Sequence, residues 1–244
     1  LAGWRRHVAT SASLVVLENS GTPNDNALSF GNVIQGNPAA PITVTIENTG
    51  DLALSLAGLQ LSGPNAGAFS FQLAGLPLNT TSTLLAGHSS ITLTLSFTPG
   101  AAGPYAATLS FFHNDSLQPN PYSLSIAATV LKPATLVVLE DSGKPNDNAI
   151  AFDTALAGAS FKPITVTVEK TGDLPLSLPG LQILGPNADA FAFSIDGQLP
   201  NTTSLLLAPN SQVTLEISFL GADPGDYTAS LQFFHNDSLQ PNPF

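Results

Sequence analysis

The chain repeats itself at an interval of 122 residues, and this duplication constrains its fold more than any other feature. The segment LVVLE begins at Leu14 and again at Leu136, and residues 13–122 align without a gap to residues 135–244. Of the 110 aligned positions, 65 are identical. One module has therefore been duplicated, and its two copies should share one fold. An interval of this length is the size of a domain, which predicts tandem domains and not a solenoid of small repeats.

Alternation of apolar and polar residues predicts β-strands within each copy. In the first copy it covers residues 42–47, 91–97 and 105–111, and it recurs over 124–130. A period of two residues is typical of half-buried strands. Turn signals separate these runs, such as the NTGD at residues 48–51, where Gly should supply a positive φ. Seven or eight short strands per copy predict an all-β fold of two tandem immunoglobulin-like antiparallel β-sandwiches.

The repeat also predicts the domain boundaries. We expect an N-terminal extension at 1–12, an immunoglobulin-like domain at 13–131, a linker at 132–135 and a second such domain at 136–244. The first copy continues past Tyr122 into a run typical of a last strand, whereas the sequence ends at Phe244, the equivalent of Tyr122. We therefore expect the second domain to lack its last strand. The first residue is Leu and no Met is present, which indicates a processed chain or a fragment.

Composition argues against several classes of protein. Six Lys and Arg stand against 17 Asp and Glu, so the formal net charge is -11. Such a chain repels nucleic-acid phosphates and anionic membrane surfaces. No Cys is present, which excludes disulfides, thiolate zinc sites and a cysteine nucleophile. No run of about 18 apolar residues occurs, so we expect no transmembrane helix.

Each copy resembles the choice-of-anchor D type repeat of bacterial surface proteins, which is itself similar to the ASPM/SPD-2/Hydin class of immunoglobulin-like domains. The segments that carry the resemblance are PITVTIENTGDLALSL from Pro41, LSGPNAGAFSF from Leu61 and HNDSLQPNPYSLSIAATV from His113. The second copy keeps this order, but Leu220 to Ala222 replace the TPG turn that the first copy has at residues 98–100. The resemblance implies exported proteins that use such domains as spacers, stalks or adhesive modules, and it implies no catalytic residue.

Two pairs of polar residues invite a catalytic or metal-binding interpretation. They are His113 with Asp115 and, one repeat later, His235 with Asp237. One His and one carboxylate provide at most two ligands, which falls short of a metal or acid–base site. We interpret both pairs as structural turns and expect neither enzymatic activity nor a cofactor.

Oxygen-rich loops give a second, weaker metal candidate. Glu18 and Asp25 in the first copy, and Glu140 and Asp147 in the second, are residues of the type that binds Ca²⁺. They do not follow the spacing of a known calcium loop. A plain loop and a calcium site both remain open interpretations.

The missing last strand carries the main functional hypothesis, and it has two interpretations. Either the sequence stops within a longer array, or a neighbouring molecule donates a strand in trans. Residues 1–12 of a second copy have the right phase for donation, since Trp4, Arg6 and Val8 correspond to Ile126, Ala128 and Val130. Arg6 fits this groove only at its rim. The residues expected to take part in assembly are Trp4, Arg6, Val8, Phe233 and Phe244.

These inferences favour a non-enzymatic structural protein at the surface of a bacterium or outside it. It would be the subunit of a fibre or stalk that self-associates head-to-tail. The alternative is a binding or spacer module of a larger adhesin or secreted enzyme, which recognises a glycan or a protein.

Overall fold

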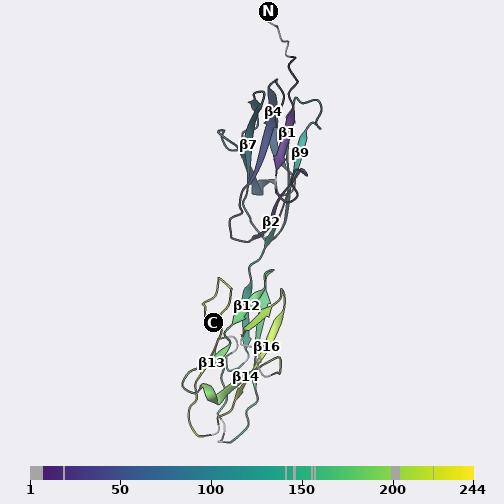
Figure 1. The fold of residues 1–244 in the computed structure, drawn as a ribbon. Helices are drawn as coiled ribbons and strands as arrows, with labels where there is room; N and C mark the ends of the chain where they lie inside the picture. Colours follow the sequence, from purple (N-terminus) through teal and green to yellow (C-terminus); the bar gives the residue numbers. More distant parts are fainter. Residues whose placement is uncertain are drawn as a thin grey trace, which may run out of the picture. The chain divides into compact units, whose positions relative to one another are not determined.

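The computed structural model describes residues 8–18, 20–140, 142–144, 147–154, 156, 158–198, 204–221 and 223–244. The chain divides into two compact units, Leu1–Leu131 and Lys132–Phe244, which we call unit 1 and unit 2 (Figure 1). Both units are built from strands, and each has its own hydrophobic core. The expected all-β, immunoglobulin-like architecture is confirmed.

The strands of unit 1 are β1 (Leu14–Glu18), β2 (Ala27–Ile34), β3 (Ile42–Asn48), β4 (Leu54–Ser62), β5 (Phe69–Leu73), β6 (Thr83–Leu85), β7 (Ser89–Phe97), β8 (Gly103–His113) and β9 (Tyr122–Leu131). They form two sheets, with the strand orders β1-β3-β7-β5 and β2-β9-β8-β4-β6. A 3-10 turn, η1 (Ala66–Ala68), precedes β5. Each sheet presents its apolar face to the core, as the alternation predicts: on β3, for example, Ile42, Val44 and Ile46 are buried.

One pairing differs from the expected antiparallel pattern. Strands β2 and β9 run parallel, with Leu28 opposite Ile126 and Val33 opposite Val130. Parallel partners need a long connection between them, and residues 35–121 provide it here. Strand β9 lies between β2 and β8, so it alone joins β2 to the second sheet.

The strands of unit 2 are β10 (Thr135–Glu140), β11 (Ile164–Thr171), β12 (Leu176–Pro179), β13 (Gln182–Leu184), β14 (Phe191–Ile195), β15 (Ser204–Leu207), β16 (Gln212–Phe219) and β17 (Ser230–Gln232), with a 3-10 turn η2 (Ala188–Ala190). The order β10-β11-β16-β14 repeats the first sheet of unit 1. Over the described residues, the other strands form only two separate pairs, β12-β15 and β13-β17. Over the described residues, the second sheet of unit 2 is therefore less continuous than that of unit 1.

Two segments that we expected to lie outside the domains, the linker and the end of the N-terminal extension, are parts of the compact units. Lys132–Thr135, expected as a linker, is part of unit 2, since Thr135 begins β10 and Ala134 is 3% exposed. In the same way Ala12, expected in a free extension, is 3% exposed and lies in the core of unit 1. Buried backbone must be hydrogen-bonded, and both segments are held by the polar contacts described below.

Candidate functional site: an open groove in unit 2

In unit 1, β9 lies between β2 and β8 in the second sheet. We call this position between the two strands the β9 seat. Strand β9 pairs along its length with β8, antiparallel, and with β2, parallel. The side chains of β9 that point into the core are at most 5% exposed: Leu124, Ile126, Ala128 and Val130. These side chains complete the core between the two sheets.

In unit 2 the equivalent seat is open. A groove of about 780 Å³ lies there, and its apolar lining includes Ile150, Phe152, Phe219 and Leu231. The described residues of 149–156 and those of 223–229, which correspond to β2 and to the start of β8, form no strand. Side chains that are buried in unit 1 become accessible as a result: Phe97 is 5% exposed, whereas its counterpart Phe219 is half-buried.

Phe244 occupies the first position of this seat. Its backbone exchanges two hydrogen bonds with Phe233, at 3.3 and 2.9 Å, and the two rings stack with their centroids 5.3 Å apart. Tyr122 at the start of β9 pairs with Phe111 in the same way, at 5.5 Å. Phe233 and Phe244, both expected to take part in assembly, thus pair as the residues at the start of β9 do in unit 1.

Three acidic residues also line the groove: Asp153, Asp223 and Asp226. Their exposed side chains replace uncharged residues at the same positions of the first copy, namely Gly31, Ala101 and Pro104. The lining contains no Lys or Arg among the described residues. Sequence reasoning missed this acidic rim, although a comparison of the positions at which the copies differ could have found it.

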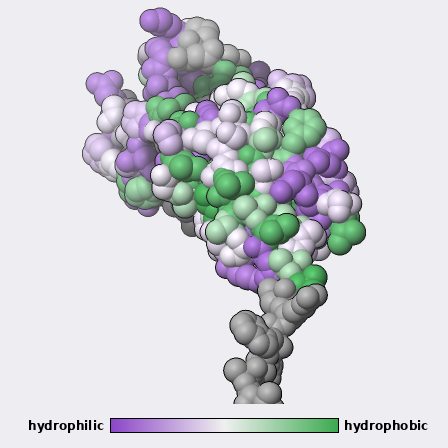
Figure 2. Space-filling view, turned by 90° about the horizontal axis from the view of Figure 1, so that it is seen from above, coloured by the Kyte–Doolittle hydropathy of each residue, from purple (hydrophilic) through white to green (hydrophobic). Residues whose placement is uncertain are grey.

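The remaining sequence candidates for assembly lie at the other end of the chain. Trp4 and Arg6 fall outside the described residues. Val8 is 83% exposed, so its side chain makes little contact within its own unit. Other exposed apolar side chains are scattered, and Figure 2 shows hydrophobic and hydrophilic residues interspersed on one face of the molecule.

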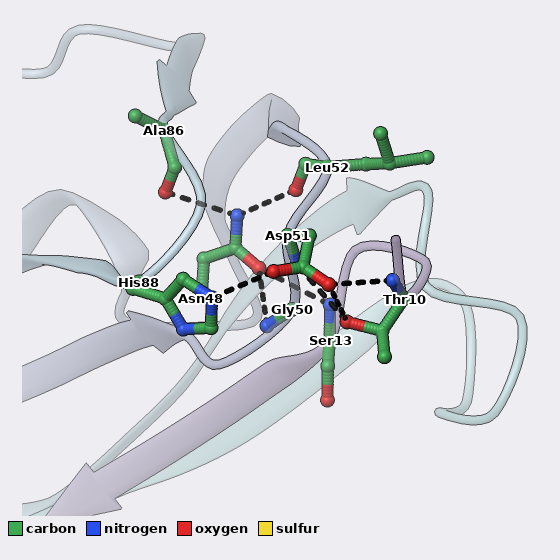
Figure 3. A network of polar contacts seen from close by, with 8 residues as sticks. All are labelled: Thr10, Ser13, Asn48, Gly50, Asp51, Leu52, Ala86 and His88. Atoms are coloured by element: carbon green, nitrogen blue, oxygen red, sulfur yellow. Dashed lines mark hydrogen bonds and ion pairs between the residues drawn. The ribbon is translucent and has the colours of Figure 1, made fainter. Parts of the chain in front are cut away.

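A polar clamp fixes the chain just after Val8, and Figure 3 shows its residues. Asp51 accepts hydrogen bonds from the backbone N–H and the hydroxyl of Thr10, at 2.6 and 2.9 Å, and its other oxygen lies 2.9 Å from His88 Nε2. Beneath it, buried Asn48 donates to the carbonyls of Leu52, Leu85 and Ala86. The clamp therefore ties Thr10 to the turn after β3.

Gly50 lies in this clamp, but for a reason other than the expected one. Its φ is not positive; instead, a Cβ there would lie 1.8 Å from the Ser11 carbonyl oxygen. Gly50 is thus required by close backbone approach. Its counterpart Gly172 combines both constraints, with φ +86° and a Cβ position 2.0 Å from the Pro133 carbonyl oxygen.

Unit 2 repeats the clamp with one change. Asp173 accepts a hydrogen bond from the Lys132 backbone N–H at 2.7 Å, as Asp51 does from Thr10. Lys170, however, replaces Asn48 and is 1% exposed, with its ammonium group donating to the Gly172 carbonyl. Burial lowers the pKa of Lys170, and the nearby Asp173 carboxylate partly opposes this by raising it.

The His–Asp pairs hold backbone in both units. His113 Nε2 donates to the Pro119 carbonyl at 2.8 Å, and Asp115 accepts from the Leu14 and Leu117 N–H groups, each at 2.8 Å. Burial raises the pKa of Asp115, but these two backbone bonds and His113 outweigh it and leave the pKa below its usual value.

The second copy repeats this geometry. His235 Nε2 donates to the Pro241 carbonyl at 2.7 Å, and Asp237 accepts from the Leu136 and Leu239 N–H groups. These four polar side chains thus fasten the first strand of each unit to the loop after the β8 region.

The candidate calcium ligands organise loops as well. Glu18 accepts backbone hydrogen bonds from Ser20 and Asp25, at 3.1 and 2.9 Å, and Asp25 accepts one from Ala27. In unit 2 the corresponding acceptors are Glu140 and Asp147. Over the described residues, no three His, Asp or Glu side chains gather closely enough to share an ion.

No protein-family model and no curated protein matches the chain. It is similar to a solved protein of unknown function from Porphyromonas gingivalis W83, with 14% identity, a TM-score of 0.34, and coverage of 94% of this chain and 96% of that one. An ASH / PapD-like domain of human CEP192 gives 12% identity and a TM-score of 0.34, and the match covers 54% of this chain and 93% of that one.

A third similar structure is the CsuC-CsuE chaperone-tip adhesion subunit complex of Acinetobacter baumannii, with 10% identity, a TM-score of 0.30 and 96% of each chain covered. At these identities the matches concern the fold alone. In the part of the chain that the structure describes, no helix is long and apolar enough to cross a membrane.

Proposed function

We propose that the chain is a non-enzymatic structural protein of a bacterial surface fibre or stalk, and that its subunits join head-to-tail by β-strand addition to unit 2. The observation that carries this proposal is the open seat of β9. The same module holds a strand in that seat in unit 1 and a groove in unit 2.

Physical chemistry supports an occupant for this groove. Exposed apolar lining and unpaired strand edges attract another extended chain, which adds main-chain hydrogen bonds while its alternate side chains fill the core. Unit 1 demonstrates the geometry that such a strand adopts, with every second side chain buried against β2 and β8. The groove thus favours a strand of alternating apolar residues over a compact small molecule.

The polar pairs also support a structural role. His113, Asp115 and their counterparts make hydrogen bonds to backbone groups, and these bonds close loops in both units alike. The proposed role is the one that the resemblance to choice-of-anchor D repeats implies. Two β-sandwich modules in tandem would bear mechanical load and make contacts outside the cell.

A peptide test addresses the groove directly. A synthetic peptide with the sequence of residues 123–131, SLSIAATVL, should bind the full chain and raise the melting temperature of unit 2. The control peptide carries Asp in place of the residues equivalent to Leu124 and Ile126, and it should have no effect. In negative-stain electron microscopy, we expect filaments of the chain alone and shorter ones with excess peptide. Dispersed single particles without peptide, and no binding of it, would instead favour a passive spacer or a loop-based binding module.

A further inference from the structure

We infer that the strand which fills the groove is the N-terminal segment of a second copy of this chain, residues 1–9, in the register that β9 has in unit 1. This inference rests on the proposed function and specifies its partner. Shifted by 122 positions, Ala2, Trp4, Arg6 and Val8 take the inward places of β9.

The connection to the clamp supports this register. In unit 1, β9 ends at Leu131, and the next residue, Lys132, is already held by Asp173 in unit 2. Residues 1–9 likewise end one position before Thr10, which is held by Asp51. A donated segment would therefore pass from the groove of one molecule to the clamp of the next with the number of residues that β9 has after Tyr122, whose place Phe244 takes.

The charge of the segment is also complementary to that of the groove. Arg5 and Arg6 are adjacent cations in a chain with a net charge of -11, and the groove carries Asp153, Asp223 and Asp226. These acids are absent from the equivalent positions in unit 1, where the seat holds the uncharged residues Ala127 and Ala128. An acidic rim thus occurs in the unit whose proposed strand is basic, and not in the unit whose strand is neutral.

The register places Arg6 beside this rim. Ala128 lies opposite Tyr105 in unit 1, so Arg6 would lie opposite Tyr227, the residue that follows Asp226. The Arg6 guanidinium group can stack there on the phenol ring. Arg5 would lie opposite Thr228 on the other face of the strand, where Asp226 is its diagonal neighbour and can pair with it. This resolves the misfit of an Arg at a position that is buried in unit 1.

The apolar positions are also compatible. Ile126 lies opposite Ala107 and beside Leu28, so Trp4 would lie opposite Ala229 and beside Ile150. Ala2 is smaller than Leu124, which leaves room next to the larger indole. The segment and the groove are different surfaces of the chain, so the contact is heterologous and propagates as an open filament.

A charge-swap experiment tests the pairing on the full chain. Arg5→Asp and Asp226→Arg should each weaken self-association about tenfold or more at low salt, as measured by analytical ultracentrifugation. An equimolar mixture of the two variants should restore assembly, since every segment then meets a groove of opposite charge. The matched control is Asp189→Arg, which makes the same charge change at an exposed residue outside the groove and should leave association unchanged.

Deletion of residues 1–8 provides the second measurement. It should abolish the filaments while leaving the thermal unfolding of unit 1 unchanged, and a peptide of residues 1–9 should then bind the groove of the truncated chain. Assembly that survives the deletion, or a mixture that does not recover, would overturn the inference. If the SLSIAATVL peptide binds but residues 1–9 do not, the proposed function stands and its donor is a different strand. If neither peptide binds, both proposals fail.

Discussion

In unit 1 the second sheet is continuous, whereas the described residues of unit 2 form only two short pairs of strands there, although 65 of 110 aligned residues are identical. The difference traces to one strand. β9 lies between β2 and β8, and without it the residues equivalent to β2 have no neighbour with which to pair. The inner strand β9 is thus needed for its two neighbours, β2 and β8, to pair along their length, because a sheet is held together by hydrogen bonds between adjacent strands.

The largest effect should come from supplying that strand. Appending the sequence SLSIAATVL directly after Phe244 should rebuild the sheet and raise the free energy of unfolding of unit 2 by roughly 3 to 5 kcal/mol. The gain is the burial of apolar area on both the strand and the groove, less the ordering of the added backbone. Calorimetry of the two units should show the melting temperature of unit 2 rising by roughly 13 to 21 °C.

The control for that experiment is the same extension with Asp at the second and fourth added positions. It should leave unit 2 unchanged, since a buried unpaired carboxylate opposes insertion. A rise with the Asp extension would mean that chain length, and not strand insertion, stabilises unit 2.

A matched pair of truncations compares the two seats side by side. Leu28 is 1% exposed in unit 1, and Leu28→Ala should destabilise that unit by about 3 kcal/mol. Its counterpart Ile150 is half-buried, so Ile150→Ala should cost less than about 1 kcal/mol. Urea unfolding measures both. When the strand is appended after Phe244, the loss of unfolding free energy caused by Ile150→Ala should approach that caused by Leu28→Ala. Equal losses without the appended strand would contradict an open groove.

The buried first residue of each NTGD-type turn offers a smaller contrast. Lys170→Asn introduces the residue found at Asn48, and we expect it to stabilise unit 2 by about 1 to 2 kcal/mol at neutral pH, because it removes a buried charge. The pKa of Lys170 is lowered in the folded state, so between that value and 10.5 the unfolded chain binds more protons and stability rises with pH. Denaturant melts from pH 7 to 10 should show this slope in the wild type and lose it in Lys170→Asn.

The reverse exchange is the control for that prediction. Asn48→Lys should destabilise unit 1, because Asn48 also accepts hydrogen bonds from the Ser13 and Gly50 N–H groups. If both exchanges destabilise their units, the contacts of Lys170 stabilise unit 2 by more than the burial of its charge costs, which contradicts the prediction.

The smallest effect concerns the acid end of the pH range. The pKa of Asp115 lies below its usual value, so its contribution to stability is present above about pH 4 and is lost as pH falls through the folded-state pKa. Asp115→Asn should therefore cost about 1 kcal/mol at pH 7 and flatten the acid limb of the stability curve of unit 1. An unchanged acid limb, measured by thermal melts between pH 2 and 7, would show that the carboxylate contributes no pH-dependent stability.

Local pattern predicted much of what the structure contains. Alternation along residues 42–47 and 124–130 anticipated β3 and β9, since a period of two fixes which side chains face the core. The repeat arithmetic makes Phe244 the equivalent of Tyr122, and the pairing of Phe244 with Phe233 agrees with it. By contrast, the parallel pairing of β2 with β9 and the attachment of Ala12 to unit 1 could not be predicted, because both depend on partners more than 30 residues away.

The sequence by itself determined the repeated module and its interval of 122 residues. These follow from identity and period, which are properties of the chain alone. Only the tertiary structure decided what the missing strand does to its neighbours, where Asp153, Asp223 and Asp226 gather, and why Gly50 must be a glycine. Each of those depends on which distant segments become adjacent, and adjacency is set by packing and strand pairing across the fold.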